Sequence, residues 1–225
     1  MTAHDAAAEI AADEPLGRAE RKRRVILEAA SQLFLRQGFP GASMDEVVAL
    51  ASVSKQTLYK HFAHKQALFV GVVESMTGEA SGRVQAAMIE PDDPAQVSAQ
   101  LQAHAHRLLD IVLTPRLLQL RRLVIGEASR FPELGRALYD GGPGRSIALL
   151  AATFARWAER GWLTVDDPMM AASHFNWLIM AEPINRAMFC GDDPFLDAAE
   201  RNAHVFGGVR VFLAAYGAGP IETDA

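Results

Sequence analysis

The tripeptide Asp-Asp-Pro occurs three times in the chain, at residues 92–94, 166–168 and 192–194. In each copy an aspartate can accept hydrogen bonds from the free amides of a helix start, and proline fits the first helical position because it has no amide hydrogen. Thr114-Pro115 has the same form with a threonine. These four sites predict helices that begin near residues 94, 115, 168 and 194.

The rest of the sequence is also patterned for helices. One long helix is expected from about residue 64 to 88, and another from about 146 to 160, ending at Gly161. No segment alternates apolar and polar residues over the length of a strand, so no sheet is expected. The chain has 225 residues, of which 50% are hydrophobic, and this is enough to bury a sizeable core. The expected fold class is therefore all-α.

The composition also bears on where the protein works. The single cysteine, Cys190, excludes an internal disulfide and fits a reducing compartment. The first fifteen residues lack the basic start and apolar stretch of a signal peptide, and no run of 18 apolar residues is present. We therefore expect a cytoplasmic protein with no membrane span.

Three short helical patterns follow one another near the N-terminus. The first runs from Arg18 towards Gly38, a glycine suited to a left-handed helix end. The second starts at Ser43, which has Glu46 three residues later and so matches a capping box. The third can be capped by Ser54 and extends over 55–61. Helices of roughly 18, 8 and 7 residues with a tight turn between the last two are typical of a helix-turn-helix unit.

Positive charge is concentrated in this N-terminal segment. Residues 18–65 contain nine Lys or Arg and four Asp or Glu, a net charge of +5 in a chain whose total is -5. The remaining residues must therefore carry -10. A small basic module joined to an acidic body is typical of a protein that binds a polyanion, although charge runs are also common on solvated helix faces.

The third helical pattern, KQTLYKH, divides into an apolar and a polar side. Leu58 and Phe62 are four residues apart and are expected to face inward, whereas the other positions present hydrogen-bonding tips. A helix of this length is not stable alone and must be held by its neighbours. Such a short helix with densely spaced donors suits the major groove of DNA.

Residues 18–69 resemble the N-terminal domain of the TetR family of transcriptional regulators. The matching stretches are ILEAASQLFLRQGF at 26–39, SMDEVVALASVSKQTLYKHF at 43–62 and HKQALF at 64–69. LVIGEASRFPELGRALYDGGP at 123–143 resembles the ligand-binding domain of the AefR/AcrR-like branch. The resemblance implies a DNA-binding domain over 18–65 and a helical ligand-binding and dimerisation domain over 66–217. Residues 1–17 and 218–225 are expected to be flexible tails.

The resemblance also implies roles for individual residues. Gln56 and Thr57 are the expected readers of bases, while Tyr59, His61 and Lys65 match positions that usually hold phosphates. Ser43 is a structural cap first, and Lys60 has no assigned role in the family pattern. Where relatives often have Ser or Asp as the next cap, this chain has His64, and we expect a compensated cap. The residues expected to contact DNA are Ser43, Lys55, Gln56, Thr57, Tyr59, Lys60, His61 and Lys65.

Dimerisation is expected because one short recognition helix gives little specificity and two copies can read a palindrome. The last two long helices, about 168–181 and 194–216, are the expected interface, and Gly207-Gly208 would allow a close helix approach. The large apolar side chains of these two helices are the candidate interface residues, although each could instead fill the core of one subunit. The candidates are Phe175, Leu178, Ile179, Phe195, Val205, Phe206, Val209 and Phe212.

The family resemblance implies a small-molecule effector, which enters a cavity between the central helices and releases the DNA. Mostly apolar side chains with a few polar tips are expected to line that cavity, and they suit a hydrophobic ligand. An aromatic or methionine stripe at helical spacing more often belongs to the core than to a pocket. The candidates are Met88, His104, Leu108, Leu118, Arg122, Ile125, Phe154, Trp157, Phe175, Trp177 and Met180.

The sequence therefore predicts a dimeric regulator of palindromic operator DNA, most often a repressor, that responds to a small molecule. Two other classes stay open, an all-helical enzyme and a protein-binding adaptor with a degenerate helix-turn-helix. No set of titratable residues suggests catalysis, and no cofactor or metal is expected. His104 and His106 point in roughly opposite directions on a helix, so they are poor partners for one metal ion.

Overall fold

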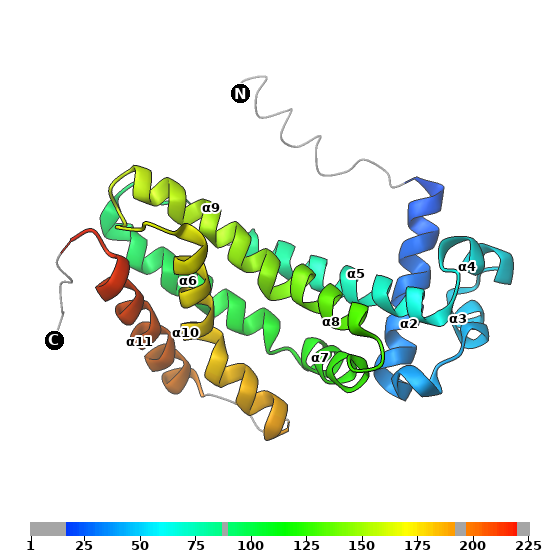
Figure 1. Ribbon diagram of the computed structural model, residues 1–225. Coiled ribbons are helices and arrows are strands. Elements are labelled where there is room, and N and C mark those ends of the chain that lie inside the picture. The colour runs from blue at the N-terminus through cyan, green and yellow to red at the C-terminus, as the bar shows by residue number, and fades with distance from the viewer. Residues whose placement is uncertain (1–16, 87–89, 192–196, 220–225) are drawn as a thin grey trace. The chain divides into compact units, whose positions relative to one another are not determined.

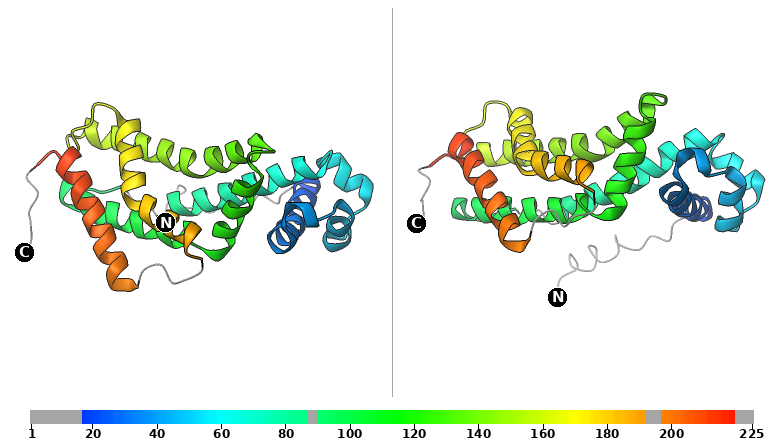
Figure 2. Two further views of the ribbon diagram at one scale, coloured as in Figure 1. Left: turned by 60° about the horizontal axis from the view of Figure 1, so that its bottom comes forward. Right: turned by 90° about the horizontal axis from the view of Figure 1, so that it is seen from below.

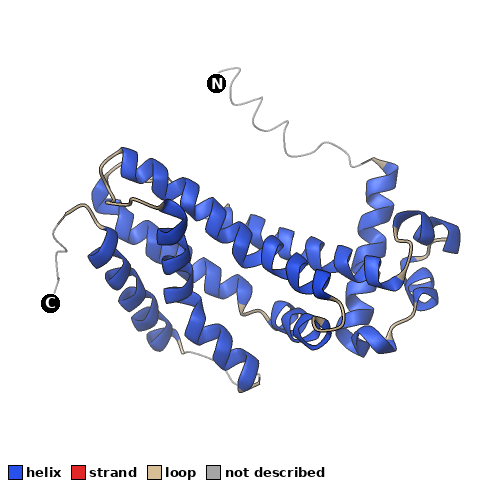
Figure 3. Cartoon of the chain, in the orientation of Figure 1, coloured by secondary structure: helices blue, strands red, loops and turns tan. Residues whose placement is uncertain are grey.

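The computed structural model describes residues 17–86, 90–191 and 197–219 (Figure 1). The described residues are almost entirely helical and contain no strand (Figure 3). Their only strand-like pairing is an isolated bridge between Leu163 and Gly217. The all-α fold class is confirmed. The expected tails lie almost wholly outside the described residues.

The chain forms two compact units, and the boundary between them falls after Val72, within helix α5. The first unit contains the helix-turn-helix and the start of α5. Its elements are α2 (Arg18–Gly41), α3 (Met44–Ala51), α4 (Lys55–His61) and the first part of α5 (Lys65–Gln85). The helix expected over 64–88 is thus described as far as Gln85, and residues 87–89 lie outside the described part.

Two residues in the left-handed conformation shape the first unit. Gly38 has a φ of 74°, as predicted for the end of the first helix, and a further helical turn carries α2 on to Gly41. Ser52 has a φ of 52° and ends α3, so the chain turns sharply before α4. Both turns use conformations that most side chains avoid, although a short polar residue such as serine tolerates one position of this kind.

The core of the first unit is aromatic. The ring of Phe69, on α5, lies 4.7 Å from that of Phe34 and 5.3 Å from that of Phe39, both on α2. Gly71 lets the same helix approach closely, because a Cβ atom there would lie 2.8 Å from the ring of Phe62 and 3.2 Å from Leu27. The first turns of α5 therefore belong to the core of the first unit.

The second unit is a bundle of helices. Its described elements are the rest of α5, the 3₁₀ turn η1 (Pro94–Gln96), α6 (Val97–Val112), α7 (Pro115–Glu127), α8 (Pro132–Tyr139), the π turn η2 (Asp140–Gly144), α9 (Arg145–Glu159), α10 (Pro168–Phe189) and α11 (Ala198–Tyr216). The predicted end of α9 is confirmed, since Gly161 follows it with a φ of 72°.

Three of the four predicted helix starts are confirmed. Asp93 accepts a hydrogen bond from the Ala95 amide at 2.8 Å and starts η1, which leads into α6. Asp167 caps α10, and α7 begins at Pro115 as predicted. The start predicted near 194 lies outside the described residues, and α11 begins at Ala198.

Aromatic rings fill the middle of the second unit. The Phe212 ring of α11 lies 5.0 Å from Phe154 and 5.2 Å from Phe175, while Phe154 also lies 5.9 Å from Trp157. Helices α10 and α11 run side by side (Figure 2). They approach closely at Gly208, where a Cβ atom would lie 2.8 Å from the Cδ1 atom of Ile179 in the same chain.

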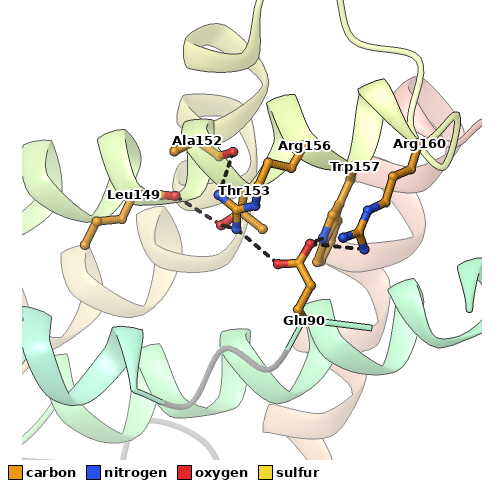
Figure 4. Close-up of polar contacts among 7 residues, drawn as sticks. All are labelled: Glu90, Leu149, Ala152, Thr153, Arg156, Trp157 and Arg160. Atoms are coloured by element: carbon orange, nitrogen blue, oxygen red, sulfur yellow. Dashed lines mark hydrogen bonds and ion pairs between the residues drawn. The ribbon is translucent and has the colours of Figure 1, made fainter. Parts of the chain in front are cut away.

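A polar contact attaches the segment before α6 to α9 (Figure 4). The indole N–H of Trp157 donates to Oε1 of Glu90 at 3.1 Å. Arg156 donates to Oε2 of the same carboxylate at 3.1 Å, and Arg160 lies 3.4 Å from Oε1. Because the Trp157 ring is buried, Glu90 satisfies an indole N–H that would otherwise have no partner.

Candidate nucleic-acid interface and internal cavity

Helix α4 is held at its start and along one side. The Ser54 hydroxyl accepts a hydrogen bond from the Thr57 amide at 3.1 Å, as the sequence predicted for the cap. Leu58 and Phe62 are both buried, so the apolar side of α4 faces the core of the first unit. The polar side of the helix is left towards solvent, which is the arrangement that a groove-reading helix requires.

The predicted capping box at α3 is also confirmed. The Glu46 amide donates to the Ser43 hydroxyl at 3.2 Å, and the Ser43 amide donates to the Glu46 carboxylate at 2.9 Å. Hydrogen bonds from Ser43, and then from Gln37, lower the pKa of Glu46. Ser43 therefore has a structural role as a helix cap.

The polar side chains of α4 differ in how free they are. Lys55, Gln56, Tyr59 and Lys60 are exposed, whereas Thr57 and His61 are partly buried. Lys55 forms an ion pair with Asp45 at 2.8 Å, and this hydrogen-bonded carboxylate raises the pKa of Lys55. Within the described part of the chain, the side chains of Gln56 and Lys60 make no hydrogen bond or ion pair.

The Thr57 hydroxyl is already engaged, since it lies 2.8 Å from the Ser54 hydroxyl in a hydrogen bond. Sequence reasoning missed this contact and the Lys55–Asp45 pair. Asp45 is ten residues from Lys55, on α3, so helical spacing alone does not bring the two together.

Lys65 and His64 both act within the first unit. The Lys65 ammonium donates to the carbonyl oxygens of Phe39 at 2.7 Å and Ala42 at 2.9 Å, and it lies 4.6 Å from the centre of the Phe39 ring. It thus satisfies carbonyls at the end of α2. His64 accepts a hydrogen bond from the Ala67 amide at 3.1 Å through Nδ1, so this histidine does serve as the cap of α5.

The second unit contains an internal cavity. The centre of a water-sized sphere can occupy about 60 Å³ there, several times the roughly 10–15 Å³ that one water requires. The lining is mostly apolar and comes from α5, α6, α7, α8, η2, α9 and α10. The lining residues are Thr77, Ala80, Ser81, Val84, Leu108, Val112, Leu117, Arg121, Leu138, Gly142, Pro143, Ser146, Asn176, Trp177, Met180 and Ile184.

The cavity includes Leu108, Trp177 and Met180 of the residues expected to line it. Most of the others lie elsewhere. Ile125 is 59% exposed, and Arg122 donates to the carbonyl oxygen of Ala187 at 2.7 Å. Met88 lies outside the described residues, and the remaining five are buried in the core and are not among the lining residues: His104, Leu118, Phe154, Trp157 and Phe175.

Arg121 is a cavity residue that the sequence did not predict, since the expected lining included only its neighbour Arg122. Burial of Arg121 lowers the pKa of its guanidinium by desolvation. The available signal was helical spacing, since Arg121 follows the apolar lining residue Leu117 by four positions. Which of two adjacent arginines faces inward depends on how α7 is rotated against its neighbours.

His104 is buried without a hydrogen-bonding partner. Its side chain is 1% exposed, and neither ring nitrogen has a hydrogen bond within the described residues. The ring centre lies 6.2 Å from that of Phe175. Desolvation by burial lowers the pKa of His104 to about 4. The histidine is therefore neutral at neutral pH and belongs to the core.

The residues expected at a subunit interface separate into two groups. Five lie in the core of one subunit, where no second chain can reach them: Phe175, Ile179, Val205, Val209 and Phe212. Phe206 is 54% exposed and Leu178 is 37% exposed, on α11 and α10. Phe195 lies outside the described residues. Of the eight expected residues, Leu178 and Phe206 are thus the two that the described structure leaves exposed.

The described residues hold no group of three or more metal-ligating side chains. In the same residues, no helix combines the length and the apolar content that crossing a bilayer requires.

Comparison with known proteins identifies both units. Residues 26–72 match the profile "Bacterial regulatory proteins, tetR family", and residues 99–218 match "AefR-like transcriptional repressor, C-terminal domain". An HTH-type transcriptional repressor of Streptomyces coelicolor is 26% identical over 79% of this chain and 88% of its own length. The HTH-type transcriptional activator FasR of Mycolicibacterium smegmatis is 35% identical, but the match spans 37% of this chain and only 39% of FasR.

Solved structures agree over most of the chain. A TetR-family regulator from Mesorhizobium loti is 38% identical, with a TM-score of 0.82 over 89% of this chain and 99% of its own. The flavonoid-responsive regulator FrrA is 31% identical, with a TM-score of 0.73 over 88% and 97% of the two chains. Proteins of this kind are regulators and not enzymes. The chain therefore belongs to the TetR family of transcriptional regulators and carries a C-terminal domain of the AefR-like type.

Proposed function

We propose that this protein is a repressor that binds palindromic operator DNA as a homodimer and is released by a small, mostly hydrophobic molecule. The observation that carries the proposal is helix α4, which is capped at Ser54, anchored by Leu58 and otherwise lined with polar tips. The description of the matching C-terminal profile as that of a repressor supports repression over activation.

Base reading is assigned to Gln56 and Thr57. The Gln56 side chain is exposed and has no competing partner within the described residues, and glutamine can pair with adenine through two hydrogen bonds. The Thr57 hydroxyl must share its bond with Ser54.

Phosphate contacts are assigned to Ser43, Lys55, Tyr59, Lys60, His61 and Lys65. Lys55 would exchange Asp45 for a phosphate, an exchange that both groups can make because both are well exposed. Lys65 is the weakest member of this set, since its ammonium already satisfies backbone carbonyls.

The geometry of DNA supports the proposed dimer. Two recognition helices reach successive major grooves on one face when they are about 34–36 Å apart. We assign the interface to the outward apolar side chains of α10 and α11, including Leu178 and Phe206. The core residues of the same helices would support that surface from behind.

The cavity of the second unit is the proposed effector site. Its largely apolar lining suits a hydrophobic molecule, and Trp177, 39% exposed, lies at its edge. The relative FrrA is described as flavonoid-responsive, and this supports control by a small molecule here.

We further propose that residues 18–65 form the DNA-binding domain, with the first turns of α5 packed in its core, and that 66–217 form the effector and dimerisation domain, in a protein that acts in the cytoplasm. A regulator of this kind must reach the chromosome, and the single cysteine fits a reducing compartment. A protein-binding adaptor would differ from this regulator in one respect. It would not need polar side chains on α4 that are exposed and make no hydrogen bond with the described residues.

The test begins with selection of operators from a random pool of DNA duplexes, followed by affinity measurements over a salt series. We expect a palindromic consensus and an affinity that falls steeply with salt. Gln56→Ala should relax the preference at particular base pairs. Lys60→Ala should weaken all sequences alike and reduce the log–log salt slope by about 1. No enrichment at low salt, or equal effects of the two variants, would contradict the proposal.

A further inference from the structure

The cavity of the second unit contains a charged group and an amide that make no hydrogen bond or ion pair with the described residues. Among the described residues that line it, Arg121 is the charged one, and no aspartate or glutamate is present. The Arg121 guanidinium makes no hydrogen bond or ion pair with the described residues, and the same holds for the side-chain amide of Asn176. Asn176 is buried, so its amide is turned away from bulk water.

Two hydroxyls of the cavity lining are already engaged. The Thr77 hydroxyl donates to the carbonyl oxygen of Val73 at 2.8 Å, and the Ser81 hydroxyl donates to that of Gly141 at 2.7 Å. The neighbouring Arg122 differs from Arg121, because its guanidinium donates a hydrogen bond to the Ala187 carbonyl oxygen. Among the lining side chains that make no hydrogen bond or ion pair with the described residues, which include Ser146 and Trp177, Arg121 is the charged group and Asn176 is the amide.

A partly buried guanidinium without a partner is costly, and an anion relieves that cost. Its fixed fork of donors matches a carboxylate in two-point geometry, and bonds between ionised groups are roughly twice as strong as neutral ones. The surrounding leucine, valine, methionine and isoleucine side chains offer nothing polar, so they suit an apolar body.

We propose that the effector is a mostly apolar molecule with a single carboxylate, which pairs with Arg121 and Asn176 inside the cavity. This inference rests on the proposed function, because it takes the cavity to be the effector site. It adds the chemical class of the effector, an amphipathic monocarboxylic acid, and the residue that selects it.

The experiment is calorimetric titration of the purified full chain with two matched pairs of probes. One pair is octanoate and octan-1-ol, and the other is 4-phenylbutyrate and 4-phenylbutan-1-ol, so that each acid has a neutral partner of the same body. We expect at least one acid to bind about tenfold or more tightly than its alcohol, the ratio that one charge-assisted contact provides.

Variants assign that preference to the proposed residue. Arg121→Gln should remove the preference while leaving the affinity for the alcohol within about threefold, and Arg121→Lys should retain part of it. Arg107→Gln is the matched control, since it removes the same charge from an exposed position on α6, away from the cavity. Thermal melting should show that all three variants fold, because Arg121 makes no hydrogen bond or ion pair with the described residues and Arg107 is exposed.

Each result decides the inference. Acid and alcohol binding equally, a preference that survives in Arg121→Gln, or a failure of both acids to bind would overturn it. Operator selection is measured without any probe, so failure of the regulator proposal is seen separately. If an alcohol binds as tightly as its acid and releases the operator, the proposed regulator and its effector cavity would stand, and the proposed carboxylate effector would be refuted.

Discussion

His104 should make the second unit sensitive to acid, because its ring is buried and neither nitrogen has a hydrogen-bond partner among the residues that the structure describes. In the unfolded chain the pKa of a histidine is near 6.5, and in the folded protein burial lowers it to about 4. Below pH 6.5 the unfolded chain gains a proton that the folded chain does not. Stability should therefore fall as the pH drops from about 6.5 to about 4, and not change from this source above 6.5.

The size of the effect follows from that pKa difference. One pKa unit corresponds to 1.36 kcal/mol, so the full loss is about 3 kcal/mol, of which about 2 kcal/mol falls between pH 7 and pH 5. His104→Leu removes the titration and also an unsatisfied buried polar group. We expect the variant to be at least as stable as the natural chain at pH 7, and the gap to widen by about 2 kcal/mol at pH 5.

Urea unfolding followed by tryptophan fluorescence measures this gap. All three tryptophans, Trp157, Trp162 and Trp177, lie in the second unit, so the signal reports that unit. The protein concentration should be the same in all samples, since association would shift the midpoint. Other groups titrate in both proteins and cancel in the difference. A less stable variant at pH 7, or a gap that does not widen, would refute the reasoning, and His106→Gln should not reproduce the gap.

Three further predictions concern packing, a polar contact and assembly. Gly71→Ala should destabilise the first unit and weaken DNA binding, because the new Cβ would lie 2.8 Å from the Phe62 ring. Gly78→Ala on the same helix places its Cβ where no atom lies within 4 Å, so it should stabilise the protein by up to about 1 kcal/mol. Thermal melts followed by circular dichroism test both variants. Glu90→Ala should lower the free energy of unfolding in urea by about 1–3 kcal/mol, because it leaves the buried Trp157 indole N–H unpaired. Glu90→Gln keeps an acceptor for that N–H and loses only ion pairs to half-exposed arginines, so it should lower the free energy by less than about 1 kcal/mol. Phe206→Glu should yield monomers in light scattering, while Ile125→Glu, an equally exposed position on α7, should not; an unchanged mass for Phe206→Glu would move the interface elsewhere.

Much of the secondary structure could be predicted because its signals are local. The Ser43–Glu46 box, the Ser54 cap and the Asp167 cap each join residues that are two or three positions apart, so the sequence alone brings the partners together. The two sides of α4 could be assigned for the same reason, since helical spacing puts Leu58 and Phe62 on one face.

Residues that face long-range neighbours could not be assigned in this way. Phe206 and Phe212 are both apolar positions of α11, yet only the packing of α11 on α6 and α10 decides that Phe212 is buried and Phe206 exposed. Arg121 and Arg122 are adjacent and identical in type, and the rotation of α7 sends one to the cavity and the other to the Ala187 carbonyl. Composition and helical period predict that a helix has an apolar side. What that side meets, whether core, cavity or solvent, depends on contacts between residues far apart in the chain, and only the tertiary structure decides those.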